Sequence, residues 1–95
     1  MLQFTKTNSG YQLQGNLVYD SVTELIHQDL TNTNAKTIKI DCSKLSHIDS
    51  AGIALFIHWQ RHSEQNKKKL QLNNLPPQAI SLITANKLAD FFYMT

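Results

Sequence analysis

The chain has 95 residues, a hydrophobic fraction of 41% and a formal net charge of +2. This length predicts one domain, spanning residues 1–95, with a single core and little room for a deep substrate cleft. The small net charge, with seven acidic residues spread along the chain, does not indicate nucleic-acid binding. A single cysteine, Cys42, excludes an internal disulfide and fits a reducing cytosol.

No apolar run is long enough to span a bilayer, since the longest extends only from Ile53 to Ile57. No charged-then-apolar signal segment opens the chain either. We therefore expect a soluble, cytoplasmic protein.

The first residues predict two antiparallel strands joined by a tight turn. Apolar and polar side chains alternate from Leu2 to Thr7 and from Tyr11 to Leu17, which is the period of a half-buried strand. Asn8-Ser9-Gly10 between them has the composition of a turn, because Asn and Gly tolerate positive φ. Gly15 inside the second strand predicts a bulge or a close backbone contact.

A helix is predicted next, from about Val22 to Thr31. Ser21 and Glu24 have the spacing of a capping box, and apolar residues then recur at helical intervals. Asn32-Thr33-Asn34 is expected to end this helix, because short polar side chains compete for the backbone hydrogen bonds.

The rest of the chain is organised around residues 37–60. Ile38 and Ile40 alternate with polar residues and predict a strand from Thr37 to Asp41, followed by a polar turn at Cys42-Ser43-Lys44. Asp49-Ser50-Ala51-Gly52 then opens an apolar helix.

Beyond that helix, Lys67-Lys68-Lys69 form a polar exit and Leu70 to Leu72 predict a short strand. A turn follows at Asn73-Asn74, and Pro76-Pro77 suit the start of a further helix, where a missing amide hydrogen has no cost. The apolar segment from Leu88 to Tyr93 is expected to pack against the sheet or against a partner.

The predicted order is β-β-α-β-α-β-α, an α/β fold with a mixed sheet of about four strands and three or more helices. Strands that alternate with helices imply parallel pairing in the second half of the chain. Helix starts then gather at the carboxyl edge of the sheet, where such folds place their sites. The turn from Asp49 to Gly52 belongs to that edge.

No nucleotide-binding or catalytic motif is recognisable. A phosphate loop needs clustered glycines, and the three glycines of this chain stand apart. Asp49 and Ser50 are neighbours at a helix start and point apart, with His47 just upstream, so they do not suit a catalytic triad. The turn can serve as a helix cap or as a recognition surface, and both interpretations remain open.

Other reactive residues have structural interpretations. His58 and His62 stand four residues apart on one helix but lack a third ligand, so we predict no metal and no cofactor. Lys67-Lys68-Lys69 are interpreted as a solvated turn, with contact to acidic lipid headgroups as the alternative. Cys42 is expected to be buried, and Trp59 to pack in the core or an interface.

The run from Ile40 to Leu55, IDCSKLSHIDSAGIAL, resembles the signature of STAS domains, the sulfate-transporter and anti-sigma-factor-antagonist modules. The segment from Leu13 to Leu17, LQGNL, resembles the second strand of that family, and the order of elements matches. The resemblance covers essentially the whole chain and implies the STAS-like α/β fold. In phosphorylation-switched members the acceptor hydroxyl directly precedes the glycine, where this chain has Ala51. Ser50 is the neighbouring hydroxyl and a candidate phosphorylation site.

The resemblance is strongest to the small MlaB-like STAS subunits of the Mla phospholipid ABC transporter, which maintains outer-membrane lipid asymmetry. It implies a non-catalytic cytoplasmic subunit that binds and supports the ATPase subunit, and that is peripheral to the inner membrane through the complex. The alternative is an anti-sigma factor antagonist that switches between a kinase and an anti-sigma factor. The partner-contacting residues carried over from the motif are His47, Asp49, Ser50, Ala51, Gly52 and Leu55.

Overall fold

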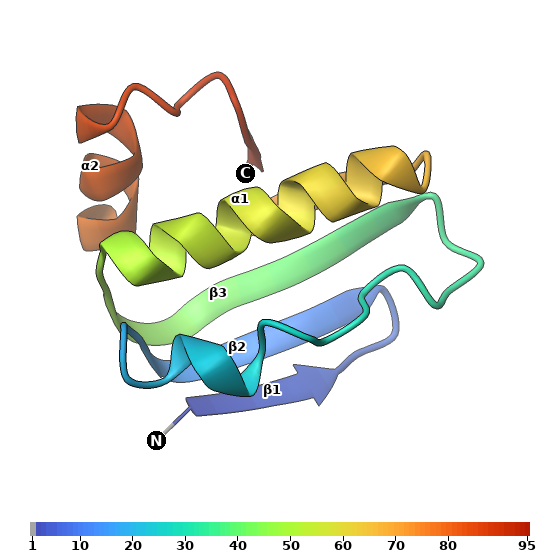
Figure 1. Cartoon of the computed structure of the whole chain (residues 1–95), viewed down its shortest axis with the longest axis horizontal. Helices are drawn as coiled ribbons and strands as arrows, with labels where there is room; N and C mark the ends of the chain where they lie inside the picture. The colour runs from blue at the N-terminus through green and yellow to red at the C-terminus, as the bar shows by residue number, and fades with distance from the viewer. Residues whose placement is uncertain (1) are drawn as a thin grey trace.

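The computed structural model describes residues 2–95 and is built around a sheet with one long helix lying along it (Figure 1). In chain order the elements are β1 (Leu2–Lys6), β2 (Gly10–Leu17), the 3₁₀ turn η1 (Val22–Glu24), β3 (Thr37–Ile48), α1 (Ser50–Gln65), β4 (Lys69–Asn73), α2 (Pro77–Ala85) and β5 (Tyr93–Met94). No helix within residues 2–95 combines the length and the apolar character needed to cross a membrane.

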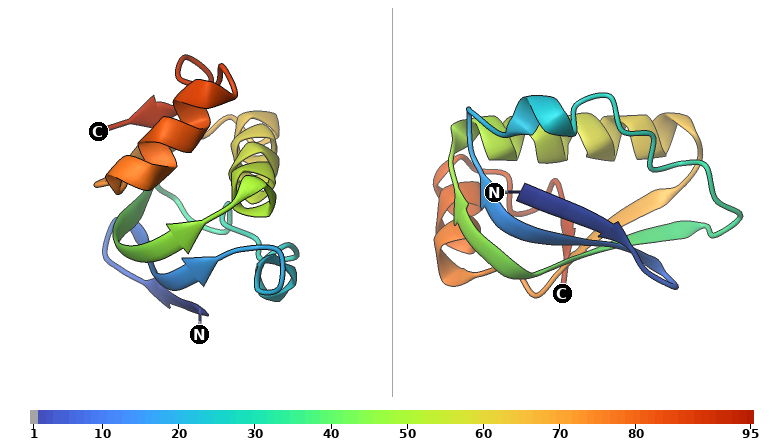
Figure 2. Two further views of the ribbon diagram at one scale, coloured as in Figure 1. Left: turned by 90° about the vertical axis from the view of Figure 1, so that its left-hand side faces the viewer. Right: turned by 90° about the horizontal axis from the view of Figure 1, so that it is seen from below.

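The five strands lie in the order β1-β2-β3-β4-β5. β1 pairs antiparallel with β2, and every later pair is parallel, so the predicted mixed α/β sheet is confirmed. Figure 2 shows the strong twist of the sheet and the position of the two helices. The sheet has five strands and not about four, because Tyr93 and Met94 pair with β4. A strand of two residues is too short to produce an alternating pattern in the sequence.

β3 corrects one sequence prediction. The strand does not end at Asp41, and Cys42-Ser43-Lys44 is not a turn, because β3 continues for 12 residues to Ile48. Its inward side chains recur every second residue at first and every third residue later. The later spacing is not that of a strand, and for this reason the sequence predicted a turn there. These buried positions are Ile38, Ile40, Cys42, Leu45 and Ile48.

The change of spacing comes from two bulges. Between the pairs Gln12–Asp41 and Gln14–Lys44, β3 advances one residue further than β2, and the same happens again before His47. Each extra residue bends a strand and resets which side chains point inward. At the first bulge the Asp41 carboxylate accepts a hydrogen bond from the Ser43 amide at 3.0 Å. This bond, together with hydrogen bonds from the Asn74 and Gln12 side chains, lowers the pKa of Asp41 to about 2. The bulge predicted near Gly15 is confirmed, and Gly15 has a φ of 105°.

The helix predicted from Val22 to Thr31 is wrong, because only η1 forms there. The Ser21 hydroxyl does not cap a helix; it donates to the carbonyl oxygen of Asn16 at 2.6 Å, accepts from the Val18 amide at 3.0 Å and so closes a turn. An isolated helix of this length is marginal and needs an apolar face packed on the core. The segment instead buries Leu25 and Leu30 from an irregular crossover.

α1 and α2 are confirmed, the second starting at Pro77 as the prolines predicted. The core lies between these helices and the sheet, and polar side chains cover the opposite face of the sheet. Phe92 of the C-terminal segment packs in this core, with its ring edge-on to Phe56 at 6.3 Å. The largest fully buried side chains are Trp59, Phe56, Leu13, Leu17, Leu30 and Ile38.

Candidate functional site

The start of α1 is fixed by Asp49. One carboxylate oxygen, Oδ1, accepts hydrogen bonds from the amides of Ala51 at 2.9 Å and Gly52 at 3.2 Å, which is N-cap geometry. The other oxygen, Oδ2, accepts from the Tyr19 amide at 3.0 Å, in the loop after β2. Because both oxygens already accept amide bonds, this carboxylate serves as a structural cap and joins two loops at the carboxyl edge of the sheet.

Gly52 brings α1 close to the sheet. A Cβ at this position would lie 2.4 Å from the Leu17 carbonyl oxygen and 2.6 Å from the Ile48 side chain. Such contacts are too short for any larger residue, so glycine is required here by close packing. Close packing alone therefore explains why residue 52 is a glycine.

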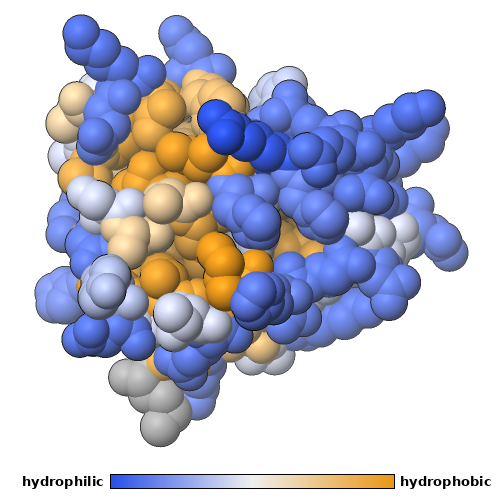
Figure 3. Space-filling view, viewed as in Figure 1, coloured by the Kyte–Doolittle hydropathy of each residue, from blue (hydrophilic) through white to orange (hydrophobic). Residues whose placement is uncertain are grey.

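Beside this turn lies an apolar groove between α1 and the segment after α2. Gln78 positions α2 there, since its side-chain amide bonds both the backbone N–H and the carbonyl of Ile48. Figure 3 shows hydrophobic side chains gathered over the part of this face where α1 begins, while hydrophilic ones cover the other end. The groove has a volume of about 160 Å³ and is lined by Ser50, Ile53, Ala54, Ile57, Asn86 and Leu88.

Besides Asp49, which caps α1, and Gly52, which is buried, the residues predicted to contact a partner fall into two groups. His47 and Ser50 are exposed, and Ala51 is half-buried, so a neighbouring molecule can reach all three. Leu55 is only 1% exposed and lies in the core, so its side chain is out of reach from the surface.

Sequence reasoning missed Tyr19 and the groove itself. Tyr19 is 76% exposed, the most exposed large hydrophobic residue described, and its backbone is held by Asp49 beside the turn. An aromatic residue in a loop gives no periodic signal, so nothing short of the tertiary structure places it here. The groove combines Ala54 and Ile57 of α1 with Leu88 from a segment more than thirty residues later, which periodicity alone cannot bring together.

Cys42 is fully buried in β3. Burial, followed by the nearby charge of Asp41, raises the pKa of its thiol to about 12. At neutral pH the sulfur is therefore a protonated, inert side chain and does not serve as a nucleophile.

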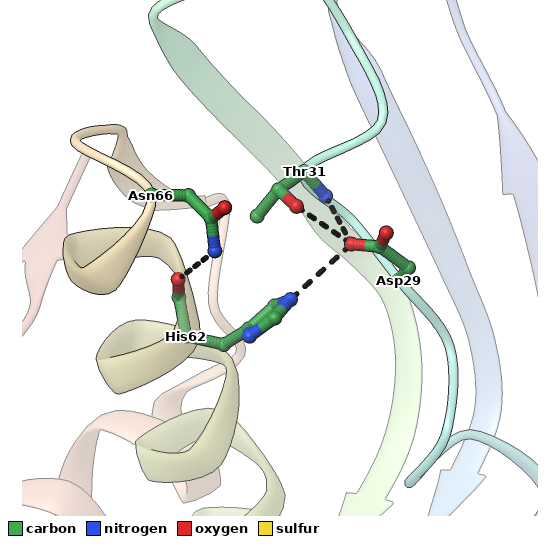
Figure 4. Close-up of polar contacts among 4 residues, drawn as sticks. All are labelled: Asp29, Thr31, His62 and Asn66. Carbon is green, nitrogen blue, oxygen red and sulfur yellow. Dashed lines mark hydrogen bonds and ion pairs between the residues drawn. The ribbon is translucent and has the colours of Figure 1, made fainter.

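The two histidines of α1 lie near the crossover from β2 to β3. His62 Nε2 is 3.2 Å from Asp29 Oδ1, and that carboxylate also accepts bonds from the amide and hydroxyl of Thr31 (Figure 4). The ring of His58 stacks parallel to that of His62 at 6.4 Å. Within residues 2–95, no three potential metal-binding side chains converge. The pair therefore serves as a surface contact that fastens the crossover to α1.

The three lysines of the helix exit differ in their surroundings. The Lys68 ammonium donates to the carbonyl oxygens of Thr33 at 2.9 Å and Ala35 at 2.8 Å, so it ties down the crossover. Lys69 Nζ lies 4.2 Å from the centre of the Tyr93 ring. Lys67 has a φ of 59° and turns the chain out of α1.

A family model described as the MlaB STAS domain matches residues 1–93. Among solved structures, the unphosphorylated anti-sigma factor antagonist SpoIIAA is similar, with a TM-score of 0.67 and 22% identity over 100% of this chain and 87% of that one. At this identity the likeness is one of fold. A search of curated proteins gave no match. With almost its whole length matched by the family model, and with the fold of a STAS protein, the chain belongs to the MlaB-like family of STAS domains.

Proposed function

We propose that the chain is a non-catalytic subunit that binds and supports the ATPase subunit of an Mla-type phospholipid ABC transporter. Membership of the MlaB-like family supports the choice of partner. In this role the chain acts in the cytoplasm, held at the inner membrane through the transporter complex, and contributes to outer-membrane lipid asymmetry. The observation that carries the proposal is the apolar groove next to the capped start of α1.

The groove has the composition of a protein-binding surface. Its floor is formed by Ile53, Ala54 and Ile57, and Ser50 and Asn86 supply polar groups. Interfaces generally place apolar contacts at the centre and polar groups around them. The small side chain of Ala54 lets a partner approach the helix closely. Tyr19, whose backbone amide bonds Asp49 at the start of α1, has an exposed side chain of the type that anchors interfaces.

The same turn is poorly suited to catalysis. Both oxygens of Asp49 already accept backbone amides, and the Cys42 thiol is buried and protonated. The three backbone bonds to Asp49 hold the turn in one shape, and a pre-organised surface lowers the entropic cost of binding. Protein docking is therefore the role that fits these residues best.

The anti-sigma factor antagonist function has weaker support. Ala51 lacks the hydroxyl of phosphorylation-switched members, and a phosphate on Ser50 would stand next to the Asp49 carboxylate, which repels it. Incubation with the kinases of the same organism, followed by mass spectrometry, tests this. A stoichiometric phosphate on Ser50 that abolishes partner binding would favour the antagonist function over the transporter.

The proposal is tested by co-purification of the tagged chain with the transporter ATPase from the same organism. Ala54→Arg puts a charge into the groove and is expected to abolish the complex, whereas Ala35→Arg adds the same exposed charge at the opposite end of β3 and should leave it intact. Circular dichroism spectra and unfolding midpoints of both variants serve as the check that they fold. Gly52 is unsuitable for this test because any side chain there disturbs packing.

Equal retention of the ATPase by both variants would contradict the docking surface. Loss of the ATPase from both would show that the charge, and not its position, matters. Failure of the unmodified chain to bind would reject the transporter role itself.

A further inference from the structure

A second surface lies at the opposite end of α1 from the groove. There the exit of α1, the start of β3 and the short β5 border a shallow, open hollow of about 460 Å³. It is lined by Lys36, Thr37, Glu64, Lys67, Lys68, Lys69 and Tyr93. Four lysines against one glutamate give this hollow a formal charge of +3, which exceeds the +2 of the whole chain. The positive charge of the molecule is therefore concentrated here.

Three of these lysines have no acidic partner. Among residues 2–95 the one ion pair is that between His62 and Asp29, so no carboxylate lies within ion-pair distance of Lys36, Lys67 or Lys69. Lys68 differs, because its ammonium is already bound by two carbonyl oxygens and is part of the fold. Three like charges held together without a counter-charge repel one another, and an anion that enters between them relieves this repulsion.

Tyr93 gives the hollow an exposed aromatic ring beside its lysines, which a simple solvated turn would not require. Its side chain is 51% exposed, and its ring lies under the Lys69 ammonium at 4.2 Å. Tyrosine combines an apolar ring with a polar hydroxyl and favours the headgroup level of a membrane. Lysine ammonium groups are attracted to anionic lipid surfaces, each contributing to attachment. The hollow thus joins the two residue types that suit a lipid surface.

We propose that this lysine hollow binds the phosphate headgroups of an anionic phospholipid bilayer. α1 is roughly 24 Å long; the groove lies along its first two turns, and the hollow lies at its exit, so the residues of α1 that line the two sites come no closer along the axis than Ile57 and Glu64, roughly 10 Å apart. The chain can therefore touch a bilayer with one end of α1 while the other end remains free for a protein. This attachment does not depend on the ATPase and goes beyond the proposed transporter role.

A lipid surface fits better than a nucleic acid. Nucleic-acid-binding domains carry a basic stripe along a helix or a whole face, whereas four of the nine basic residues here line one hollow and the others are spread along the chain. The remaining residues together are slightly acidic, because the hollow exceeds the net charge of the chain. An anionic bilayer would therefore attract the molecule through the hollow alone, and a flat anionic surface can be contacted at a single site.

The test is flotation of the purified chain with vesicles. We expect it to float with phosphatidylcholine vesicles that contain an equal amount of phosphatidylglycerol, to stay unbound with phosphatidylcholine alone, and to be released by high salt. Changing Lys36, Lys67 and Lys69 to Gln one at a time is expected to lower the partition coefficient about fivefold each. Tyr93→Ala should lower it further, with Tyr93→Phe intermediate.

The matched control removes the same charge elsewhere, with Lys6→Gln, Lys44→Gln and Lys87→Gln, all exposed and outside the hollow. Equal losses in the two sets would overturn the proposal, since net charge alone would then explain binding. Equal flotation with both vesicle types would also overturn it. Because the assay contains no ATPase, it can fail while the docking groove stands. ATPase binding by the Lys36→Gln, Lys67→Gln, Lys69→Gln triple variant is expected to remain normal.

Discussion

The two ends of α1 both hold the crossover between β2 and β3, but by different means. At its start the Asp49 carboxylate accepts three backbone amides, and Gly52 packs against the carbonyl of Leu17. At its end His62 meets the Asp29 carboxylate, with their side chains 38% and 60% exposed, and Lys68 reaches two loop carbonyls. One end is fixed by packing, whereas the other is held by contacts that water can replace.

The surface at the start of α1 is therefore more firmly held than the surface at its end. Exposed ion pairs contribute little, about 0–1 kcal/mol, because water competes for both partners. A helix cap and a packed glycine act where water has less access and contribute more. The start of α1 therefore presents a partner with a fixed shape, while the end of α1 presents charge on side chains held only by solvent-accessible contacts.

The largest expected effect is at Gly52. Gly52→Ala is expected to destabilise the chain by about 1–3 kcal/mol, because the Cβ meets backbone that cannot move aside. The gain of about 1 kcal/mol in helix propensity does not offset it. Urea unfolding measures the change, with Ala54→Val as the control that adds methyl groups to an exposed position of the same helix. Equal stability of Gly52→Ala and the unmodified chain would contradict the close contact.

Asp49→Ala is expected to come next, at about 1–2 kcal/mol, since it removes the cap. Asp49→Asn keeps an oxygen for the cap but cannot accept at its amide nitrogen, so its effect should be smaller. Asp90→Ala, at an exposed position, is the control. If Asp49→Ala unfolds at the same urea concentration as Asp90→Ala, the two ends of α1 do not differ as described.

At the other end, Lys68→Met is expected to cost roughly 1 kcal/mol, since it removes two hydrogen bonds to carbonyls that water can then reach. Hydrogen exchange should quicken in residues 33–36 and stay unchanged at the start of α1. Lys67→Met, which removes a charge but neither of these bonds, is the control. Faster exchange in both variants would mean that charge, and not the two bonds, holds the crossover.

The smallest effect concerns the acid titration of Asp29. Hydrogen bonds from the Thr31 hydroxyl, then from its amide, then from His62 hold the pKa of this carboxyl below its ordinary value of 3.8. A depressed pKa contributes stability that is present above 3.8 and is lost as the pH falls through the folded value. NMR titration should show Thr31→Val raising the pKa more than His62→Gln does. The reverse order would make the histidine the dominant contact.

The same comparison explains what sequence reasoning could predict. The start of α1 depends on neighbours in sequence, with Asp49 capping residues two and three positions ahead, and the predicted cap is confirmed. The crossover depends on distant contacts, namely His62 with Asp29 and Lys68 with Thr33. Local propensity predicted a helix there, and tertiary contacts gave an irregular segment instead.

The end of β3 was predicted wrongly for a related reason, although its start at Thr37 is confirmed. Its two bulges arise from pairing with β2, so the spacing of Cys42, Leu45 and Ile48 has meaning only beside that strand. Tyr19 and the groove were missed because they combine separate parts of the chain. The resemblance to STAS domains identified the turn, but only the structure shows which of its side chains face outward.

The most direct test of the central claim is an NMR footprint of the isotope-labelled chain bound to the transporter ATPase. We expect signals of Tyr19, Ser50, Ala54 and Ile57 to broaden or shift, while those of Lys67-Lys68-Lys69 stay unchanged. A footprint at the lysines that leaves Ala54 and Ile57 unaffected would contradict the account, because the partner would then occupy the charged end of α1.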